Sequence, residues 1–578
     1  MSPQASQWKR SNTQRPCRST STDALLARIR DGLLGAGAAV PGPFGAKPLV
    51  YADYTASGRS LAFLETAIAE RVLPYYANTH TETSYTGRQS TRLREGAREA
   101  VRRGVGADGR HAVIFAGSGA TGAVDRLVQV LGLKAPEGLR AAVPERDRPV
   151  VFVGPYEHHS NELPWRESIA RVVRIPLGAD GRPCLSALEE ALAAHADRPL
   201  KVGAFSAASN VTGIRTDLDA IARAMHAHGG IVVCDYAAGG PYMPIRMVES
   251  APGAGDHKDA AVISPHKFVG GPGTPGILVA DRALFANSVP AVSGGGTVSY
   301  VTADSHCYVR DPERREEAGT PGIVESIRAG LVFQLKQDVG TEAIAEREAL
   351  FVRRALEAWG GEPAIALLGP EDADRLAIFS FNIRVGGKCL HHNFVVALLN
   401  DLFGIQARGG CSCAGPYAHD LLGLACEDAR RHEALVGRGL GLFRPGWARL
   451  GFNFFLDEAE ADYIVRAVLF VARHGARFLA SYRPDPATGV WMHSAGKPPA
   501  TLEFADLCAA WRGGDEVAAG RERAPDYETC LAAAHDAAHM TGPAPERVVL
   551  DEEAEAARWF WMPHEAGELM AGVGDGAR

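Results

Sequence analysis

Lys267 stands where a lysine can act as a nucleophile instead of a solvated surface charge. It lies in the turn-rich segment Ser264–Gly273, beside His266 and directly after the apolar run Ala260–Ile263. In open α/β sheets, ligands bind at strand ends of this kind. Partial burial there lowers the pKa of a lysine, and a cationic neighbour lowers it further, so that the amine can form a Schiff base. A solvated lysine in a surface loop is the competing interpretation, and this segment alone does not decide between them.

An earlier apolar run, about thirty residues before Lys267, ends in a carboxylate. The run is Ile231–Asp235, and it reads as a buried strand with Asp235 at its end. In an enzyme that uses pyridoxal 5′-phosphate (PLP), an aspartate in such a place binds the protonated pyridine nitrogen and keeps the ring an electron sink. An aspartate that merely opens a turn would be the preferred interpretation if Asp235 stood alone. Asp235 and Lys267 both stand at strand ends, and the chain between them has the length of one helical crossover connection. Their co-occurrence therefore predicts a PLP site.

The segment Phe115–Gly122 has the composition of an anion-binding turn. An apolar run passes through small residues into a helical pattern, so free backbone N–H groups and a helix N-terminus would face a phosphate. The same window fits the dinucleotide pattern G-x-G-x-x-G, which makes a nucleotide-binding oxidoreductase the main alternative. That alternative requires an acidic residue about 20 positions on, at the end of a second strand. Glu137 is near that distance but lies in the turn Ala135–Gly138, which disfavours the oxidoreductase.

Two histidines, His158 and His159, lie in the segment Pro155–Asn161, which follows the apolar run 150–153. A histidine ring can lie on the face of a cofactor and move protons. Metal ligands and ordinary loop residues are the alternatives. No neighbouring set of acids, histidines and cysteines has zinc-ligand spacing, so we expect no metal.

The elements that must position these residues alternate along the first half of the chain. Short β-branched runs predict buried strands, and the segments between them carry apolar residues at helical spacing. The predicted strands are 112–116, 150–153, 200–205, 231–234 and 260–263, and the predicted helices include 121–131, 185–195 and 218–228. Such alternation indicates a mostly parallel sheet that is covered on both faces.

Composition shifts suggest four parts of the chain. They are an N-terminal tail and lead-in segment (1–45), a large domain (46–322), a smaller domain (323–482) and a C-terminal extension of unknown role (483–578). A long helix from Ile323 and a strand at Ile378–Arg384 are expected in the smaller domain. The late apolar stretch Tyr463–Ala480 is interrupted by arginines, which favours a packed amphipathic helix over a membrane span.

Charge and cysteine content restrict partners and compartment. A net charge of −7 and a pI near 6.3 give no reason to expect nucleic acid or an anionic membrane as partner. The 10 cysteines are scattered, which indicates a reducing compartment. The acid-free, basic first 22 residues suit an organellar transit peptide or a disordered tail. Without a clear amphipathic pattern we favour the tail, and we expect a cytoplasmic enzyme.

Taken together, these segments resemble the class V aminotransferase family, and within it the cysteine desulfurase and selenocysteine lyase branch, over about Tyr51–Leu469. The resemblance implies the α/β architecture of PLP-dependent aminotransferases (fold type I), with a large mixed, mostly parallel sheet domain and a smaller α/β C-terminal domain. It also assigns roles to individual positions. They are Ala120 and Thr121 in the phosphate loop, His158 stacked on the ring, Asn210 at the 3′ oxygen, Asp235 at the pyridine nitrogen, Ser264 and His266 at the phosphate, Lys267 in the Schiff base, and Thr320 at the phosphate of the neighbouring subunit in a homodimer.

The substrate end of the resemblance lies in the smaller domain. Arg449 matches an arginine that grips the substrate α-carboxylate as a bidentate fork. Arg408 and Cys413 have the spacing of the branch's loop arginine and its sulfur-accepting cysteine, which is carried on a flexible loop. A lone arginine is usually a surface residue, and cysteine is often a small buried hydrophobe. The pair Cys411 and Cys413 could also bind metal or oxidise, but a Gly-rich polar loop is a poor place for a core thiol.

The resemblance implies a C–S lyase. Lys267 removes the α-proton of an amino acid, L-cysteine in our interpretation, with His158 assisting, and Asn210, Arg408 and Arg449 contribute to substrate binding. Cys413 then takes the sulfur as a persulfide, alanine is released, and a second thiol, Cys411 or a sulfur-acceptor protein, collects the sulfur.

The sequence departs from the branch at two positions. Ala238 replaces a glutamine, and Thr81 instead of an arginine follows His80. These departures leave PLP binding intact and bear on the substrate. Another class V enzyme (an aminotransferase, an epimerase or a non-desulfurase lyase) therefore stays open, as does a non-catalytic descendant of the fold.

Overall fold

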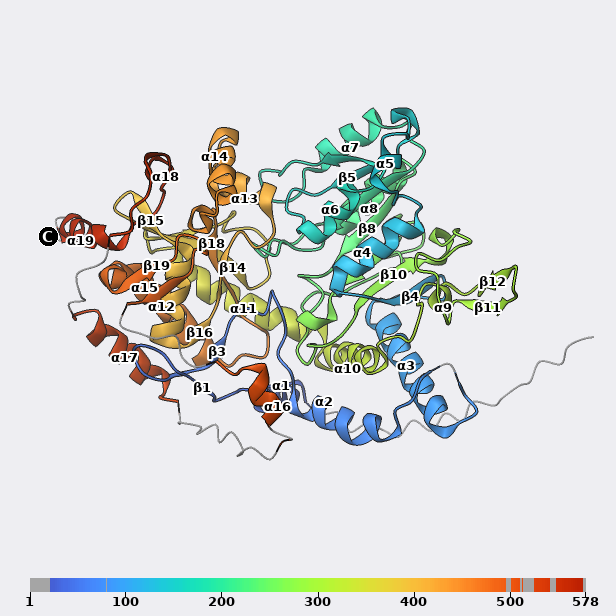
Figure 1. Cartoon of the computed structure of the whole chain (residues 1–578), viewed down its shortest axis with the longest axis horizontal. Helices are drawn as coiled ribbons and strands as arrows, with labels where there is room; N and C mark the ends of the chain where they lie inside the picture. The colour runs from blue at the N-terminus through green and yellow to red at the C-terminus, as the bar shows by residue number, and fades with distance from the viewer. Residues whose placement is uncertain are drawn as a thin grey trace, which may run out of the picture.

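Two α/β units lie side by side in the computed structural model, which describes residues 21–79, 81–494, 501–509, 512, 524–540 and 547–574 (Figure 1). The larger unit is built on a seven-stranded sheet with the strand order β4-β10-β9-β8-β7-β5-β6. Its strands are β4 (His111–Ala116), β5 (Val150–Val153), β6 (Arg171–Arg174), β7 (Lys201–Ser206), β8 (Ile231–Asp235), β9 (Ala260–Ile263) and β10 (Gly276–Asp281). Only β10 runs antiparallel to its neighbours, so the predicted mixed, mostly parallel sheet is confirmed.

Alternating side chains of these strands feed two separate cores. Ala112, Ile114 and Ala116 of β4 belong to one apolar cluster, whereas Val113 and Phe115 belong to another. This alternation follows from the period of two in a strand, because successive side chains point to opposite faces. Both faces must therefore be covered, and helices lie on each side of the sheet (Figure 1).

Three helices of the large unit, α4 (Gly119–Val130), α7 (Leu185–Ala194) and α8 (Leu218–Ala227), differ from their predicted ranges by one or two residues at their ends. The unit also contains α3 (Tyr85–Gly104) and α6 (Leu163–Arg166), for which no range was predicted. The long helix expected from Ile323 is two helices, α10 (Ile323–Val339) and α11 (Thr341–Trp359). They are separated by Gly340, whose φ of 88° lies outside the helical region.

The smaller unit contains an antiparallel sheet in the order β13-β14-β18-β17, with β15 beside β14. The strands are β13 (Ile365–Leu367), β14 (Ile378–Val385), β15 (Lys388–Leu390), β17 (Arg408–Gly410) and β18 (Trp447–Gly451). Its helices include α12 (His392–Phe403), α13 (Gly415–Leu422), α14 (Cys426–Gly437) and α15 (Glu458–His474). The β17–β18 pair is the important one for function, because Arg408 lies directly opposite Arg449 in its register.

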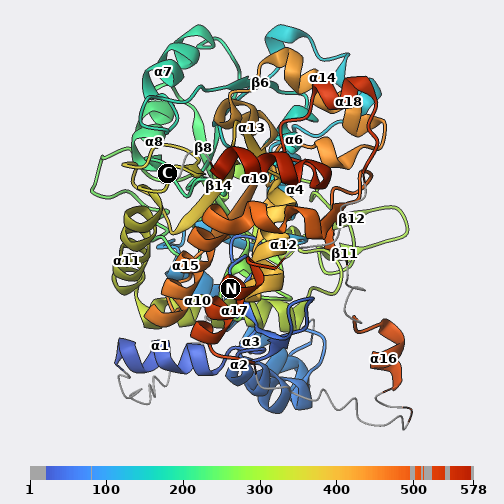
Figure 2. The same ribbon diagram turned by 90° about the vertical axis from the view of Figure 1, so that its left-hand side faces the viewer.

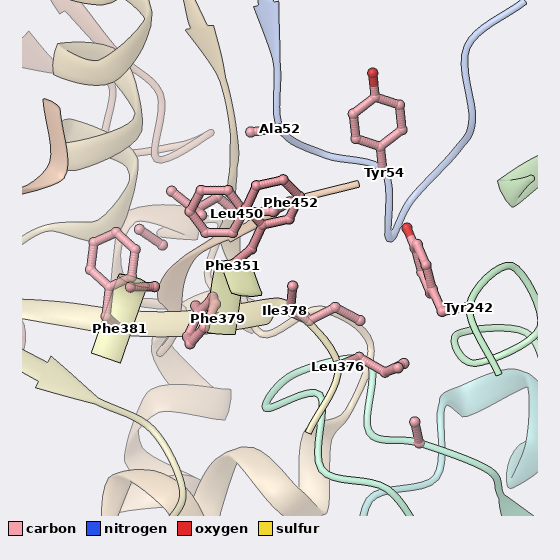
Figure 3. Packing of buried hydrophobic residues seen from close by; sticks show 14 of the residues in the cluster. Ala52, Tyr54, Tyr242, Phe351, Leu376, Ile378, Phe379, Phe381, Leu450 and Phe452 are labelled. Atoms are coloured by element: carbon pink, nitrogen blue, oxygen red, sulfur yellow. The ribbon is translucent and has the colours of Figure 1, made fainter. Parts of the chain in front are cut away.

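The two units share one continuous apolar cluster (Figure 3). Phe351 of α11, Phe379 of β14 and Phe452 pack together there, and Tyr54 and Tyr242 reach the same region from the N-terminal loop and the large unit. In addition, β3 (Val50–Tyr51) pairs with β16 (Ile405–Gln406) of the smaller unit. The loop that follows β3 is therefore fixed where the two units meet.

Two described segments of the C-terminal extension, 524–540 and 547–574, pack on the smaller unit, whereas α16 (Phe504–Ala509) buries no side chain and stands apart from it (Figure 2). Helix α17 (Tyr527–Ala537) lies against α12 and α15, and the segment 559–561 continues the small sheet beside β15, through hydrogen bonds between the backbones of Cys389, Trp559 and Trp561. Phe560 and Met562 are fully buried. These two segments thus contribute to the small-domain core.

At the other end of the chain, α1 (Thr22–Asp31) buries Leu26 and Ile29 against the body of the protein. No helix within the described ranges is long and apolar enough to cross a membrane.

Candidate active site

A cavity of about 240 Å³ lies between the strand ends of the large unit and the β17–β18 face of the smaller one. The sequence-predicted residues that line it are Ala120, Thr121, His158, Asn210, Asp235, Ser264, His266, Lys267, Arg408, Cys413 and Arg449. Every predicted site residue except Thr320 therefore meets at one place, although these residues come from segments far apart in the chain.

Lys267 reaches the cavity from a short helical turn, Pro265–Lys267, directly after β9. Burial lowers the pKa of its amine to about 8, because the charged form is poorly solvated there. The carboxylate of Asp235 opposes this shift, and the guanidinium groups of Arg449 and Arg408 add to it. A substantial fraction of the amine is therefore neutral near physiological pH, as a nucleophile requires.

Asp235 is the last residue of β8, the parallel neighbour of β9, and only 3% of it is exposed. Its Oδ1 accepts a hydrogen bond from the Ala237 amide at 2.7 Å. Burial raises the pKa of this carboxyl, while the Ala237 amide and Lys267 lower it. The carboxylate therefore needs a cationic partner in the cavity, which a protonated pyridine ring provides.

The N-terminus of α4 forms a cradle opposite Lys267. The Ala120 amide donates to Ser264 Oγ at 2.9 Å, and Gly119 has a φ of 55°. A Cβ on Gly119 would lie 3.0 Å from both Ser264 Oγ and His266 Cε1, so only glycine leaves this corner open. Amides at a helix N-terminus together with a serine hydroxyl suit a phosphate group.

His158 is held in one tautomer by Ser160. The Ser160 amide donates to His158 Nδ1 at 3.1 Å, so Nδ1 is an acceptor and Nε2 carries the proton. Thr121 Oγ1 donates in turn to Ser160 Oγ at 2.6 Å, and that oxygen lies 3.1 Å from Nδ1. Burial and the nearby Lys267 lower the pKa of His158 to about 4. The ring is therefore neutral, and this chain of hydroxyl groups is a feature that sequence reasoning missed.

Asp53 joins the two arginines on the opposite wall. Its Oδ1 accepts from Arg449 Nη2 at 3.0 Å and its Oδ2 from Arg408 Nε at 2.9 Å. Arg449 Nη1 also donates to the backbone oxygen of Asn210 at 2.9 Å. Arg449 Nε is buried with no partner among the described residues, so this guanidinium still has a donor for an anion in the cavity. Asp53 lies in the loop that follows β3, and its contacts with the two arginines were not predicted from the sequence.

The cysteine loop, residues 411–414 between β17 and α13, places Cys413 in the cavity and Cys411 outside it. Cys413 is exposed and lines the cavity, whereas Cys411 packs against an apolar cluster that contains Tyr417 and Trp447. Ser412 and Cys413 have φ angles of 54° and 56°, an uncommon conformation for residues other than glycine.

Three hydrogen bonds tie this loop to the large unit. The Asn210 amide group donates to Ser412 O at 2.8 Å, the His159 amide donates to Cys413 O at 3.0 Å, and the Gly415 amide donates to His159 Nε2 at 3.2 Å. His159 therefore serves the cysteine loop, while His158 faces the cavity.

Three other positions named from the sequence have clear outcomes. Thr320 is exposed, lies outside the cavity of its own chain, and accepts a hydrogen bond from Asn78 Nδ2 at 3.2 Å. Ala238 lines the cavity and leaves space where the branch has a glutamine. Glu137 begins a short helix instead of ending a strand, as the argument against a dinucleotide site required. His80 lies outside the described residues.

The donor set fits PLP. A buried carboxylate, a lysine with a lowered pKa and an open helix N-terminus surround one cavity, and they match the pyridine nitrogen, the aldehyde and the phosphate of that cofactor. Asn210 Oδ1 and Ser412 Oγ are also buried without partners in the described part of the chain, which leaves further polar atoms for a bound molecule.

Comparisons with known proteins agree with this geometry. The profile of the aminotransferase class-V family matches residues 50–463. A probable cysteine desulfurase of Halalkalibacterium halodurans is 28% identical over 373 residues, which cover 64% of this chain and 85% of the relative. A cysteine desulfurase of Klebsiella pneumoniae is 29% identical over 374 residues, covering 64% and 85%.

Solved structures extend the likeness to the fold. The apo cysteine desulfurase of Thermococcus onnurineus NA1 has a TM-score of 0.60 at 23% identity and covers 74% of this chain and 95% of its own. The cysteine desulfurase CsdA of Escherichia coli has a TM-score of 0.59 at 21% identity and covers 78% and 98%. The chain belongs to the class V aminotransferase family and is a PLP-dependent enzyme similar to cysteine desulfurases.

Proposed function

We propose that this enzyme is a cysteine desulfurase that takes sulfur from L-cysteine onto Cys413 and releases L-alanine. The single observation that carries the proposal is that the Cys413 thiol shares one cavity with Lys267 and Arg449, whereas Cys411 lies outside it. An aminotransferase or epimerase would have no use for a thiol facing the catalytic lysine.

In this proposal the small-domain wall binds the substrate. Arg449 receives the α-carboxylate, and its unpartnered Nε supplies the free donor that a carboxylate needs. Arg408 lies on the neighbouring strand, is held by Asp53, and adds positive charge at the mouth of the cavity. The substrate side chain then points toward Cys413.

The large-domain wall performs the proton chemistry. When bound, PLP supplies an electron sink that the Asp235 carboxylate keeps protonated. The neutral amine of Lys267 takes the α-proton, because its pKa of about 8 matches the working pH range of a general base. His158 presents its Nε2–H to the cavity as a hydrogen-bond donor, and the Ser160 amide at Nδ1 keeps the ring in this tautomer.

Sulfur transfer is balanced without an added oxidant or reductant. The Cys413 thiolate attacks the sulfur of L-cysteine, the new S–S bond forms, and the Cβ–S bond breaks. The electron pair of the broken bond stays with the carbon skeleton and is captured by a proton, which yields alanine. The enzyme keeps a persulfide, and a second thiol can collect its terminal sulfur.

Replacing Cys413 and Cys411 separately tests the proposal, because the two thiols share one loop and differ in whether they face the cavity. We expect Cys413→Ala to lower alanine formation from L-cysteine by about a hundredfold or more, since a reacting group is removed. Cys411→Ala is the matched control and should keep most of the activity. Undiminished alanine release by Cys413→Ala, with the PLP absorbance unchanged, would overturn the proposal and favour a different class V reaction.

We further propose a homodimer with Thr320 at the neighbouring subunit's phosphate site. Thr320 is exposed, and so are large apolar side chains nearby in sequence, Tyr300 and Val301 of β11 (Val298–Val301). Two-fold dimers are the commonest assemblies of soluble proteins. A sulfur-acceptor protein as partner and a cytoplasmic location complete the proposal, and sedimentation analysis of the purified protein tests the dimer.

A further inference from the structure

Three potential metal ligands meet at the edge of the large sheet that lies away from Lys267. His226 comes from the last turn of α8, and His257 and Asp259 come from the segment just before β9. One ligand atom from each lies within 4.8 Å of the other two. Since Asp259 precedes β9 and Lys267 follows it, the length of that strand separates this cluster from the cavity.

The two side chains at the centre of the cluster already have the supporting contacts that metal ligands require. His226 Nδ1 lies 2.7 Å from the backbone oxygen of Gly255, which accepts its proton and leaves Nε2 toward Asp259. Asp259 Oδ2 accepts from the Val232 amide at 2.7 Å and lies 2.9 Å from His226 Nε2. Its Oδ1 faces His257 Nε2 at 3.8 Å.

The third ligand, His257, has a carboxylate nearby that lies beyond hydrogen-bond distance. His257 Nδ1 lies 3.9 Å from Glu249 Oε1, and the Glu249 carboxylate is itself fixed by the Gly253 and Gly255 amides at 3.0 Å each. The nearest lysine does not compete for the cluster, because Lys258 Nζ donates to Asp219 Oδ1 at 2.7 Å. His226 and Asp259 are therefore held by hydrogen bonds in the pattern that orients metal ligands, whereas His257 is not fixed in this way.

We infer that His226, His257 and Asp259 form a Zn²⁺ site with a solvent molecule as the fourth ligand. Two imidazoles and one carboxylate are a donor set that suits Zn²⁺. The rings of His226 and His257 are now stacked, with centroids 4.0 Å apart and an angle of 14° between their planes. Both nitrogens can point at one ion only if a ring turns, and His257, whose side chain is 33% exposed, is the one free to do so.

Such an ion would tie the end of α8 to the segment 249–259, which follows it later in the chain. It would connect α8 to the Gly-rich loop 249–257 and to the start of β9. Because metal binds the folded arrangement and not the unfolded chain, Zn²⁺ should raise the melting temperature without touching the active-site cavity.

The test uses the full-length, PLP-loaded protein with its thiols alkylated, so that cysteines cannot hold the metal. After removal of metal with a chelator, Zn²⁺ is titrated by calorimetry and thermal unfolding is followed with and without Zn²⁺. We expect about one equivalent to bind, with an increase in Tm. His257→Ala should weaken binding by about tenfold or more and abolish the increase in Tm.

His228→Ala is the matched control, because this histidine follows the same helix and is not one of the three ligands. It should bind Zn²⁺ as the wild type does. Asp259→Asn should also lose Zn²⁺ binding. The Asp259 carboxylate also holds the Val232 amide, so if Asp259→Asn does not fold, His257→Ala alone provides the test. Absent binding to the wild type, or equal affinity in His257→Ala, would overturn the inference.

Discussion

The large-domain wall of the cavity carries Asp235 and Lys267 at the ends of neighbouring strands, whereas the small-domain wall carries Arg449 on a strand and Cys413 on a loop. The first wall is set by the backbone of one sheet. The second depends on side-chain contacts that cross between the two units, such as Asp53 to both arginines and Asn210 to Ser412. In the proposed function, the cofactor chemistry thus belongs to the wall that the sheet backbone sets, and substrate binding belongs to the wall that contacts between the two units hold in place.

The largest effect is expected on the first wall, from Lys267→Ala. This variant should lose the covalent attachment of PLP and lower turnover of L-cysteine by about 10³-fold, within the range for loss of an acid–base group. Borohydride reduction followed by peptide mapping measures the attachment. Lys134→Ala, on the exposed surface, is the control. A pyridoxyl adduct on another lysine in the wild type would contradict the assignment.

On the second wall, Arg449→Lys should lower kcat/KM for L-cysteine by about a hundredfold. Lysine keeps the charge but cannot form the planar two-point contact with a carboxylate. The absorbance of bound PLP should stay unchanged, because Arg449 is assigned to the substrate. If Arg449→Lys lost PLP binding instead of substrate binding, Arg449 would serve the cofactor, and the division of roles between the two walls would be wrong.

The pH dependence of PLP attachment tests the first wall alone. Burial lowers the pKa of Lys267 to about 8, and only the neutral amine reacts. The rate of attachment to apoprotein should therefore rise about tenfold per pH unit below pH 8 and level off above it. Asp235 raises this pKa, so Asp235→Asn should move the inflection to lower pH. An inflection that stays in place would remove Asp235 as a neighbour of the amine.

A smaller effect, about tenfold in kcat/KM, is expected from Asp53→Asn. Arg449 keeps its second anchor at Asn210 O, but the described contacts of Arg408 include no other carboxylate. If Asp53 acts by holding Arg408, then Arg408→Ala and the double variant should show the same loss. Additive losses in this double-mutant cycle would mean that the two residues act independently.

The smallest effect on turnover is expected in the extension. Phe560 is fully buried between His391 and Phe443. Phe560→Ala should lower the free energy of unfolding by about 3–5 kcal/mol and leave kcat/KM nearly unchanged, because the cavity is not touched. Denaturant titration and steady-state kinetics measure the two quantities. A large loss of turnover with little loss of stability would assign the extension a catalytic role.

The same contrast explains how much could be predicted from the sequence. Asp235, Lys267 and the Gly119 turn were found because each follows an apolar strand, and strand ends of a parallel sheet meet at one edge. The contacts of Asp53 with Arg408 and Arg449 were not, since they join segments that only the tertiary fold brings together. The three residues of the cluster, His226, His257 and Asp259, do not have the spacing of a known metal motif. The prediction of no metal was based on such local spacing, and it therefore did not consider them together.

In the proposed function, Cys413 takes the sulfur across the cavity from Lys267. A single turnover with sulfur-labelled L-cysteine and no added thiol, followed by alkylation and fragmentation of the loop peptide, tests it directly. We expect one labelled sulfur on Cys413 and one alanine released per labelled site. Label on Cys411 alone, or free sulfide with no protein-bound sulfur, would contradict it.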